Sequence, residues 1–349
     1  MAYSVAFPGH LHVLRQSGAV AKSGTGTSKP ASLAALWAKN YVTSLANRDE
    51  AEQIKRTSEL AEIASAEGRQ RTANFLKQNL TQASAKAWSL TNDLLADEIW
   101  RHGINPQVIN PWQIAADSHH LFEIALNAYG ERVTPRRLSV LVNNEFGQVR
   151  RKYTAEDPRA IGVVSMQFHY TGQLLLDYLS PSEHLLLQHY FKVMDDHLYM
   201  PLKAAYEAAA NYEYDSPLLQ AVRELLPNST RIAQEVCKRI SQQYPGYQSY
   251  SGPLGSLKVR ISSIRDVEMF QVYLCLCVLE NSIQSVQQEL FPLCVMLYPR
   301  LQVNWKLVQE MLRAIGWEMH DSLSADTVAA FLPYLSEVTE MFSIEAFQE

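Results

Sequence analysis

Histidine and carboxylate side chains lie close together in the middle of the sequence, at spacings that suit a metal site. Glu98 and His102 are four residues apart, and Asp117, His120 and Glu123 follow one another at intervals of three. In a helix these spacings put side chains on one face. Helical bundles bind iron or another transition metal with such sets. No Glu-x-x-His pair completes the pattern, so we expect no cofactor and keep a metal- or cofactor-binding enzyme as the alternative.

A second polar group interrupts an apolar stretch that is predicted to be helical. Gln167 and His169 lie between apolar and aromatic neighbours, and a buried polar group needs a hydrogen-bond partner. A short connection should make helices 158–179 and 181–211 antiparallel, which brings the Asp195-Asp196-His197 cluster near. A hydrogen-bonded core histidine is the simpler interpretation. The alternative is a pocket with these candidate residues: Gln167, His169, Asp196 and His197.

Tyrosines and arginines supply the candidate contact residues. Tyrosine suits interfaces because its ring is apolar and its hydroxyl is polar. Three tyrosines lie in the loop 244–256, and the helix over 135–153 is basic at both ends. The apolar middle of that helix and the acidic residues around it argue against nucleic acid. The interface candidates are therefore Tyr244, Tyr247, Tyr250, Arg136, Arg137, Arg150 and Arg151.

Motifs for nucleophilic or phosphate chemistry are missing from the sequence. No Gly-x-Ser-x-Gly occurs, and the four cysteines form no Cys-x-x-Cys pair. Scattered cysteines in a chain of this length are typical of buried free thiols in a reducing compartment. The net charge of −5 gives no general attraction to nucleic acid or anionic lipid. We therefore predict no catalytic residue.

The elements that must position these side chains are helices. Five times a capping residue precedes proline, which is a strong signal for a helix start. Apolar residues then recur with a helical period. An alternating stretch from Leu257 to Ser262 resembles a strand, but its flanks lack turn residues. The predicted helices are 31–47, 49–67, 70–80, 82–102, 111–129, 135–153, 158–179, 181–211, 217–226, 229–243, 257–290, 299–316 and 324–341.

The predicted fold is all-α, an irregular multi-helix array or bundle with a flexible N-terminal tail over residues 1–30. One helical lobe spans 31–243 and a second, over 257–349, packs on it; one continuous domain is the alternative. Pro201 should break the helix over 181–211. We expect the apolar helix 257–290 near the centre of the core.

No apolar run is long enough to span a bilayer, and the first residues lack a secretory signal. We therefore predict a cytoplasmic protein without a transmembrane segment. Peripheral membrane association stays open, and so does a targeting role for the N-terminal tail.

The stretches Val163–Pro201 and Phe291–His320 resemble an uncharacterised helical protein family of cyanobacteria. The resemblance carries no catalytic motif and no site residue. It implies a cytoplasmic or thylakoid-associated setting and an accessory role. Together with the absent motifs, it favours a non-catalytic interaction or assembly factor that binds other proteins. A nucleic-acid-binding regulator is the second alternative.

Overall fold

Helices make up almost all of the part of the chain that the structure describes. The computed structural model describes residues 31–43 and 58–343, so the tail predicted over residues 1–30 lies outside it. The strands found within these ranges are β1 (Gln248–Ser249) and β2 (Gly252–Pro253), which pair antiparallel. The prediction of an all-α, multi-helix array is confirmed.

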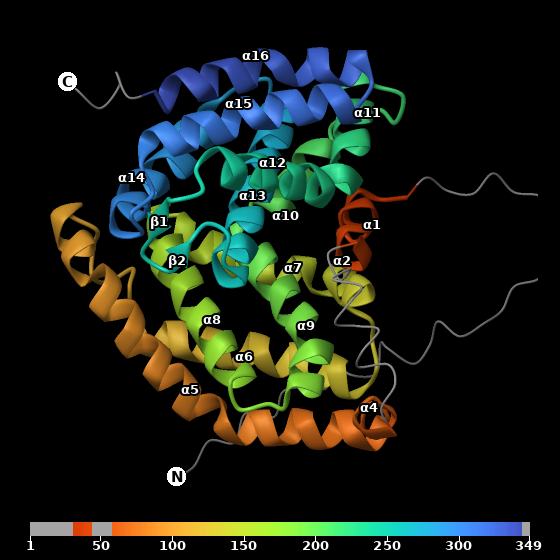
Figure 1. Cartoon of the computed structure of the whole chain (residues 1–349), viewed down its shortest axis with the longest axis vertical. Helices are drawn as coiled ribbons and strands as arrows, with labels where there is room; N and C mark the ends of the chain where they lie inside the picture. The colour runs from red at the N-terminus through yellow and green to blue at the C-terminus, as the bar shows by residue number, and fades with distance from the viewer. Residues whose placement is uncertain (1–30, 44–57, 344–349) are drawn as a thin grey trace, which may run out of the picture. The chain divides into compact units, whose positions relative to one another are not determined.

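The helices differ widely in length, and Figure 1 shows their arrangement. In chain order they are α1 (Leu33–Trp37), α2 (Asn40–Thr43), α4 (Ser58–Ile63), α5 (Ala66–Arg101), α6 (Pro111–Gly130), α7 (Pro135–Thr154), α8 (Ala160–Leu176), α9 (Pro181–Tyr199), α10 (Leu202–Ala209), α11 (Pro217–Leu225), the 3-10 helix η2 (Leu226–Asn228), α12 (Ser229–Gln243), α13 (Leu257–Glu280), the π-helix η3 (Val286–Leu290), α14 (Phe291–Arg300), α15 (Trp305–Ser322) and α16 (Ala325–Met341).

Proline marks helix starts as the sequence predicts. Ser180 and Glu183 form a capping box at the start of α9, which satisfies two orphan amides of its first turn. Asp157 departs from the pattern, because its carboxylate accepts from the backbone and side chain of Arg159 and α8 begins later, at Ala160. At the other four capping-residue–proline pairs a helix begins at the proline, as predicted. These prolines are Pro111, Pro135, Pro181 and Pro217.

Several helix boundaries differ from the prediction; the one over 299–316, for example, spans the end of α14 and the start of α15. The two helices predicted over 70–80 and 82–102 form one continuous helix, α5, since no proline or glycine interrupts it after Gly68. The break predicted at Pro201 separates α9 from α10. The helix predicted over 257–290 ends early, at Asn281, whose φ of 49° is left-handed and closes α13.

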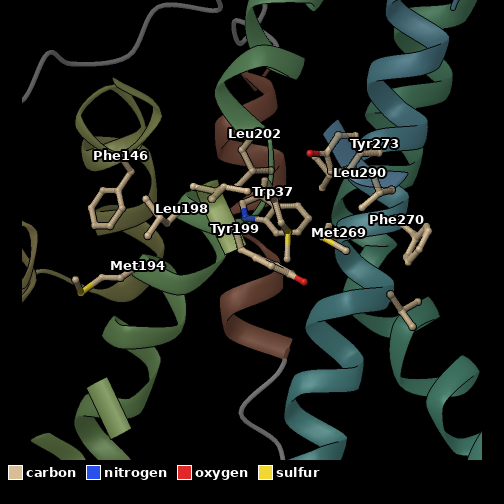
Figure 2. Close-up of a cluster of buried hydrophobic side chains, with 14 of the residues drawn as sticks. Trp37, Phe146, Met194, Leu198, Tyr199, Leu202, Met269, Phe270, Tyr273 and Leu290 are labelled. Carbon is tan, nitrogen blue, oxygen red and sulfur yellow. The ribbon is translucent and has the colours of Figure 1, made fainter. Parts of the chain in front are cut away.

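The centre of the core is α13, as the sequence predicts. Every residue from Val267 to Leu279 is buried. The helix contacts α9, α10, α11, α12 and α16. Trp37, from α1, is 0% exposed and lies between Leu198 and Leu202 on one side and Met269 and Tyr273 on the other (Figure 2).

The two predicted lobes make extensive contact. Residues Ser32–Glu349 form one compact unit. In it α12, which precedes the loop 244–256, packs against α13 and α15, which follow the loop. The long helix α5 packs on α6 and α8, and α15 lies beside α16 (Figure 1). Among the described helices, none is long and apolar enough to cross a membrane.

Candidate functional site

A cavity of about 140 Å³ lies where α8, α12, α13, α14 and α15 meet under the loop 244–256. Most of its wall is apolar. The helix α13 lines it from Lys258 to Val267 and α15 from Leu307 to Met311, and α8 contributes another part of the wall. Apolar side chains that line it include Val236, Ile240, Val259, Leu297, Val308 and Met311.

One end of this cavity is charged. Arg265 lies over the ring of Tyr199, with its guanidinium carbon 4.5 Å from the ring centroid. It is 3.8 Å from a carboxylate oxygen of Asp195 and 3.9 Å from one of Asp266. The Nδ1 atom of His169 is 3.1 Å from the same oxygen of Asp195. Arg265, Asp266, Tyr199 and His169 therefore present polar groups at one end of an apolar space.

Two atoms of this charged end lack hydrogen bonds. Nε of Arg265 and Oδ1 of Asp266 are buried and have no hydrogen-bond partner within the described residues. Burial raises the pKa of Asp266 to about 6, against the opposing effect of Arg265. Buried polar groups are usually hydrogen-bonded, so these two atoms stand out among the residues that line the cavity.

Of the four predicted pocket residues, His169 alone lines this cavity. It meets Asp195, a member of the cluster predicted to face it. Gln167 instead donates to the backbone oxygen of Ser84 at 2.9 Å. Asp196 is 2.8 Å from Nζ of Lys192, which also reaches Glu268 at 2.9 Å.

His197 belongs to the core and not to the cavity. Its Nδ1 is 2.8 Å from the backbone oxygen of Val193, and its Nε2 is 3.4 Å from the hydroxyl of Ser139. The ring stacks on Tyr41 and meets Phe146 edge-on. Burial lowers the pKa of His197 to about 4, so the ring is neutral at pH 7. His197 is therefore a hydrogen-bonded histidine of the core.

The predicted metal set is dispersed. Glu98 is 3.5 Å from His102, but Arg101 and Arg300 also lie within 3.6 Å of its carboxylate. Asp117 accepts from the side chains of neighbouring α7 instead, and His120 is exposed.

Glu123 pairs with His119 at 3.4 Å, apart from Glu98 and Asp117. In the described ranges, no three histidine, cysteine, aspartate or glutamate side chains are grouped so as to hold a metal ion.

The predicted contact residues divide into exposed and buried ones. Arg136, Arg137 and Tyr250 are exposed, and Arg151 pairs with Glu207 at the surface. Tyr244 and Tyr247 are half-buried.

The assignment of Arg150 to the surface is wrong. Its side chain is 7% exposed and donates to the backbone oxygens of Leu198 and Tyr199, to Tyr273 and to Glu289. Neighbouring residues of a helix point about 100° apart, so Arg150 lies on the inward face of α7 while Arg151 faces the solvent.

Several residues at the cavity were not predicted. Arg265 and Asp266 carry no motif, and their partners are distant in sequence. Lys258 and Arg260 had a signal, since they alternate with Leu257, Val259 and Ile261. In a helix, Leu257, Val259 and Ile261 cannot all lie on the buried face, because residues two apart point in different directions. Val259 is 4% exposed, whereas Leu257 is 54% exposed and Ile261 52%.

These features define an all-α protein with a part-polar cavity between its helices. Among families of known proteins, the model of the phycobilisome protein family matches residues 190–342, which is less than half of the chain. The matched region starts within α9 and reaches the end of α16, so it includes every cavity wall except the part from α8. It is consistent with the resemblance to helical proteins of cyanobacteria. No curated protein and no solved structure matches the chain.

Proposed function

We propose that this protein is a non-catalytic assembly or accessory factor that docks proteins of the phycobilisome on its helical surface. The observation that carries the proposal is the match to the phycobilisome protein family over residues 190–342. A protein of that family has other proteins as its natural partners. The setting that follows is cytoplasmic, at or near the thylakoid surface.

Exposed aromatic side chains support a docking role. Trp100 is 86% exposed at the end of α5, and Trp112 is 85% exposed at the start of α6. Tyr250 is 55% exposed in the loop over the cavity. Large aromatic side chains are enriched where proteins bind one another and are costly to leave in water.

Sedimentation with isolated phycobilisomes tests this function. The full chain, carrying an epitope tag, is mixed with phycobilisomes and with their dissociated components, and each mixture is run on a sucrose gradient. We expect the protein to move to the dense fractions with at least one of these samples. A tagged, unrelated helical protein of the same size serves as the control. A protein that stays at the top of every gradient contradicts the proposal.

A second candidate function is the binding of a small molecule in the cavity. The atoms of Arg265 and Asp266 that lack a hydrogen bond, in residues that line an apolar space, favour it. Such a ligand would have an apolar body and a group that both accepts and donates hydrogen bonds.

Native mass spectrometry and the absorption spectrum of protein isolated from its natural source test this candidate. We expect a retained mass that is lost when Val308 is replaced by tryptophan, which fills the cavity. Replacing Val303, a half-buried residue of the cavity lining, by the similarly sized threonine is the milder control. Ligand binding is contradicted if the wild-type protein carries no additional mass, or if the Val308→Trp variant carries the same additional mass.

A further inference from the structure

The first turns of α13 and α15 are held together by the loop 244–256. The amide of Tyr250 donates to the backbone oxygen of Leu301 at 3.0 Å. The hydroxyl of Tyr247 donates to the backbone oxygen of Gln302 at 2.7 Å and accepts from the amide of Asn304 at 2.8 Å. Asn304 caps α15, so one loop fixes the place where both helices begin.

Cations occupy both of these helix starts. Lys258 and Arg260 belong to the first turns of α13, and Lys306 to the first turn of α15. All three side chains are exposed, and neither first turn carries an acidic residue. Within the described ranges, no carboxylate lies within ion-pair distance of any of them, whereas most other exposed arginines and lysines of the helices have one.

This arrangement is unfavourable for the isolated protein. A helix N-terminus carries positive partial charge, so acidic residues stabilise it and basic residues destabilise it. Two such ends, with three cations that form no ion pair, adjoin the same loop on a chain whose net charge is −5. Helix stability therefore does not account for these residue types.

Exposed apolar side chains border the cations. Leu257 and Ile261 are one helical turn apart and are both more than half exposed, and so is Tyr250 on the loop that precedes α13. A surface that is apolar and cationic together matches a partner that is apolar and acidic. We name this surface the basic–apolar patch, and it consists of Tyr250, Leu257, Lys258, Arg260, Ile261 and Lys306.

We propose that the basic–apolar patch docks an acidic segment of a partner protein, one in which carboxylates flank a large apolar residue. This inference rests on the proposed docking function and assigns its surface. Two other anionic partners fit less well. Recognition of anionic lipid typically uses four to eight clustered cations, more than the patch offers. Nucleic acid requires a wider basic surface than a chain with a pI of 6.1 presents here.

Fluorescence anisotropy with a labelled probe peptide tests the proposal on the full chain. The probe is the peptide Glu-Glu-Leu-Phe-Glu-Glu-Leu-Glu. Two further peptides carry glutamine in place of every glutamate or serine in place of every apolar residue. We expect saturable binding of the first peptide that weakens as salt is added, and little binding of the other two.

Charge reversal locates the binding. The variant with Lys258→Glu, Arg260→Glu and Lys306→Glu should bind the probe at least about tenfold more weakly. The matched control carries Lys238→Glu and Arg313→Glu, which are exposed cations with carboxylate partners on their own helices. The pair Leu257→Ser and Ile261→Ser should also weaken binding. Circular dichroism verifies that each variant is folded.

Three outcomes overturn the proposal: no binding of the probe, binding that the triple charge reversal leaves unchanged, or binding of the protein to phosphatidylglycerol vesicles through these residues without binding of the probe. The sedimentation assay separates this inference from the proposed function. If the charge-reversed protein still sediments with phycobilisome proteins, docking uses another surface. If the wild-type protein binds the probe but never sediments, the proposed function fails while the patch stands.

Discussion

Replacement of Arg150 by methionine should destabilise the fold far more than replacement of its neighbour Arg151. The Arg150 guanidinium makes four hydrogen bonds at 2.8–3.0 Å, two of them to the last backbone oxygens of α9. Methionine fills the space of the aliphatic stem but donates nothing. The two carbonyl groups then lie buried without a donor, and Glu289 loses its cation.

The size of the effect follows from burial. Breaking a buried ion pair by removing one partner costs about 3–5 kcal/mol. Glu289 is 32% exposed, so water screens part of its loss, and Tyr273 still donates to it at 3.1 Å. We therefore expect a loss near the lower limit, about 3 kcal/mol. Arg151 is 59% exposed and pairs with a half-exposed Glu207, and such surface pairs contribute less than about 1 kcal/mol.

Urea unfolding followed by circular dichroism at 222 nm measures the difference. The Arg150→Met variant should unfold at a lower urea concentration with an unchanged slope, and Arg151→Met should unfold close to the wild type. A third variant, Arg150→Lys, keeps the charge but not the forked geometry, and should lie between them. Equal losses for Arg150→Met and Arg151→Met would refute the buried network.

Three further predictions concern the core. Trp37→Ala should cost about 3–5 kcal/mol in urea unfolding because the indole is fully buried, whereas Trp100→Ala should change stability by less than about 0.5 kcal/mol; similar losses would contradict the burial of Trp37. The pKa of His197 is about 4 in the folded protein and 6.5 in the unfolded chain. The stability that the neutral ring contributes is therefore fully present above pH 6.5 and is lost as the pH falls toward 4. The stability advantage of wild type over His197→Asn should therefore shrink by up to about 3 kcal/mol over that range, and a constant difference would speak against it. Burial raises the pKa of the Cys237, Cys275 and Cys294 thiols, so Ellman's reagent should label the native protein slowly and all four cysteines quickly in urea; fast native labelling would show open access.

Local signals made the fold largely predictable. A capping residue followed by proline satisfies the first turn from within a few residues, so helix starts such as Pro111 and Pro181 can be found in the sequence. Position in the core was also predictable for α13, because a helix that is apolar all round has to be buried. The division of α5 failed because a long helix without a breaker gives no boundary to detect.

The candidate site was less predictable because its contacts join distant parts of the chain. Arg265 meets Asp195, and Arg150 meets Glu289, at separations that no local pattern encodes. Histidine and carboxylate spacing on one helix could not show whether a second helix would complete a metal site. The alternation after Leu257 resembles a strand, but on the helix predicted there it places exposed apolar residues beside exposed cations.

The position of Trp37 has a consequence for how the matched region can be studied. The indole, with Asn40 and Tyr41, fills the interior between helices that belong to residues 190–342, although it comes from far upstream. A fragment trimmed to the matched residues would leave a hole where this segment sits. It would also uncover the half-buried Lys192, which lies over the ring of Tyr41, and its buried partner Glu268. Expression of residues 190–342 alone should therefore yield aggregates or a loosely packed chain, and the segment from Ser32 would have to be supplied to restore it.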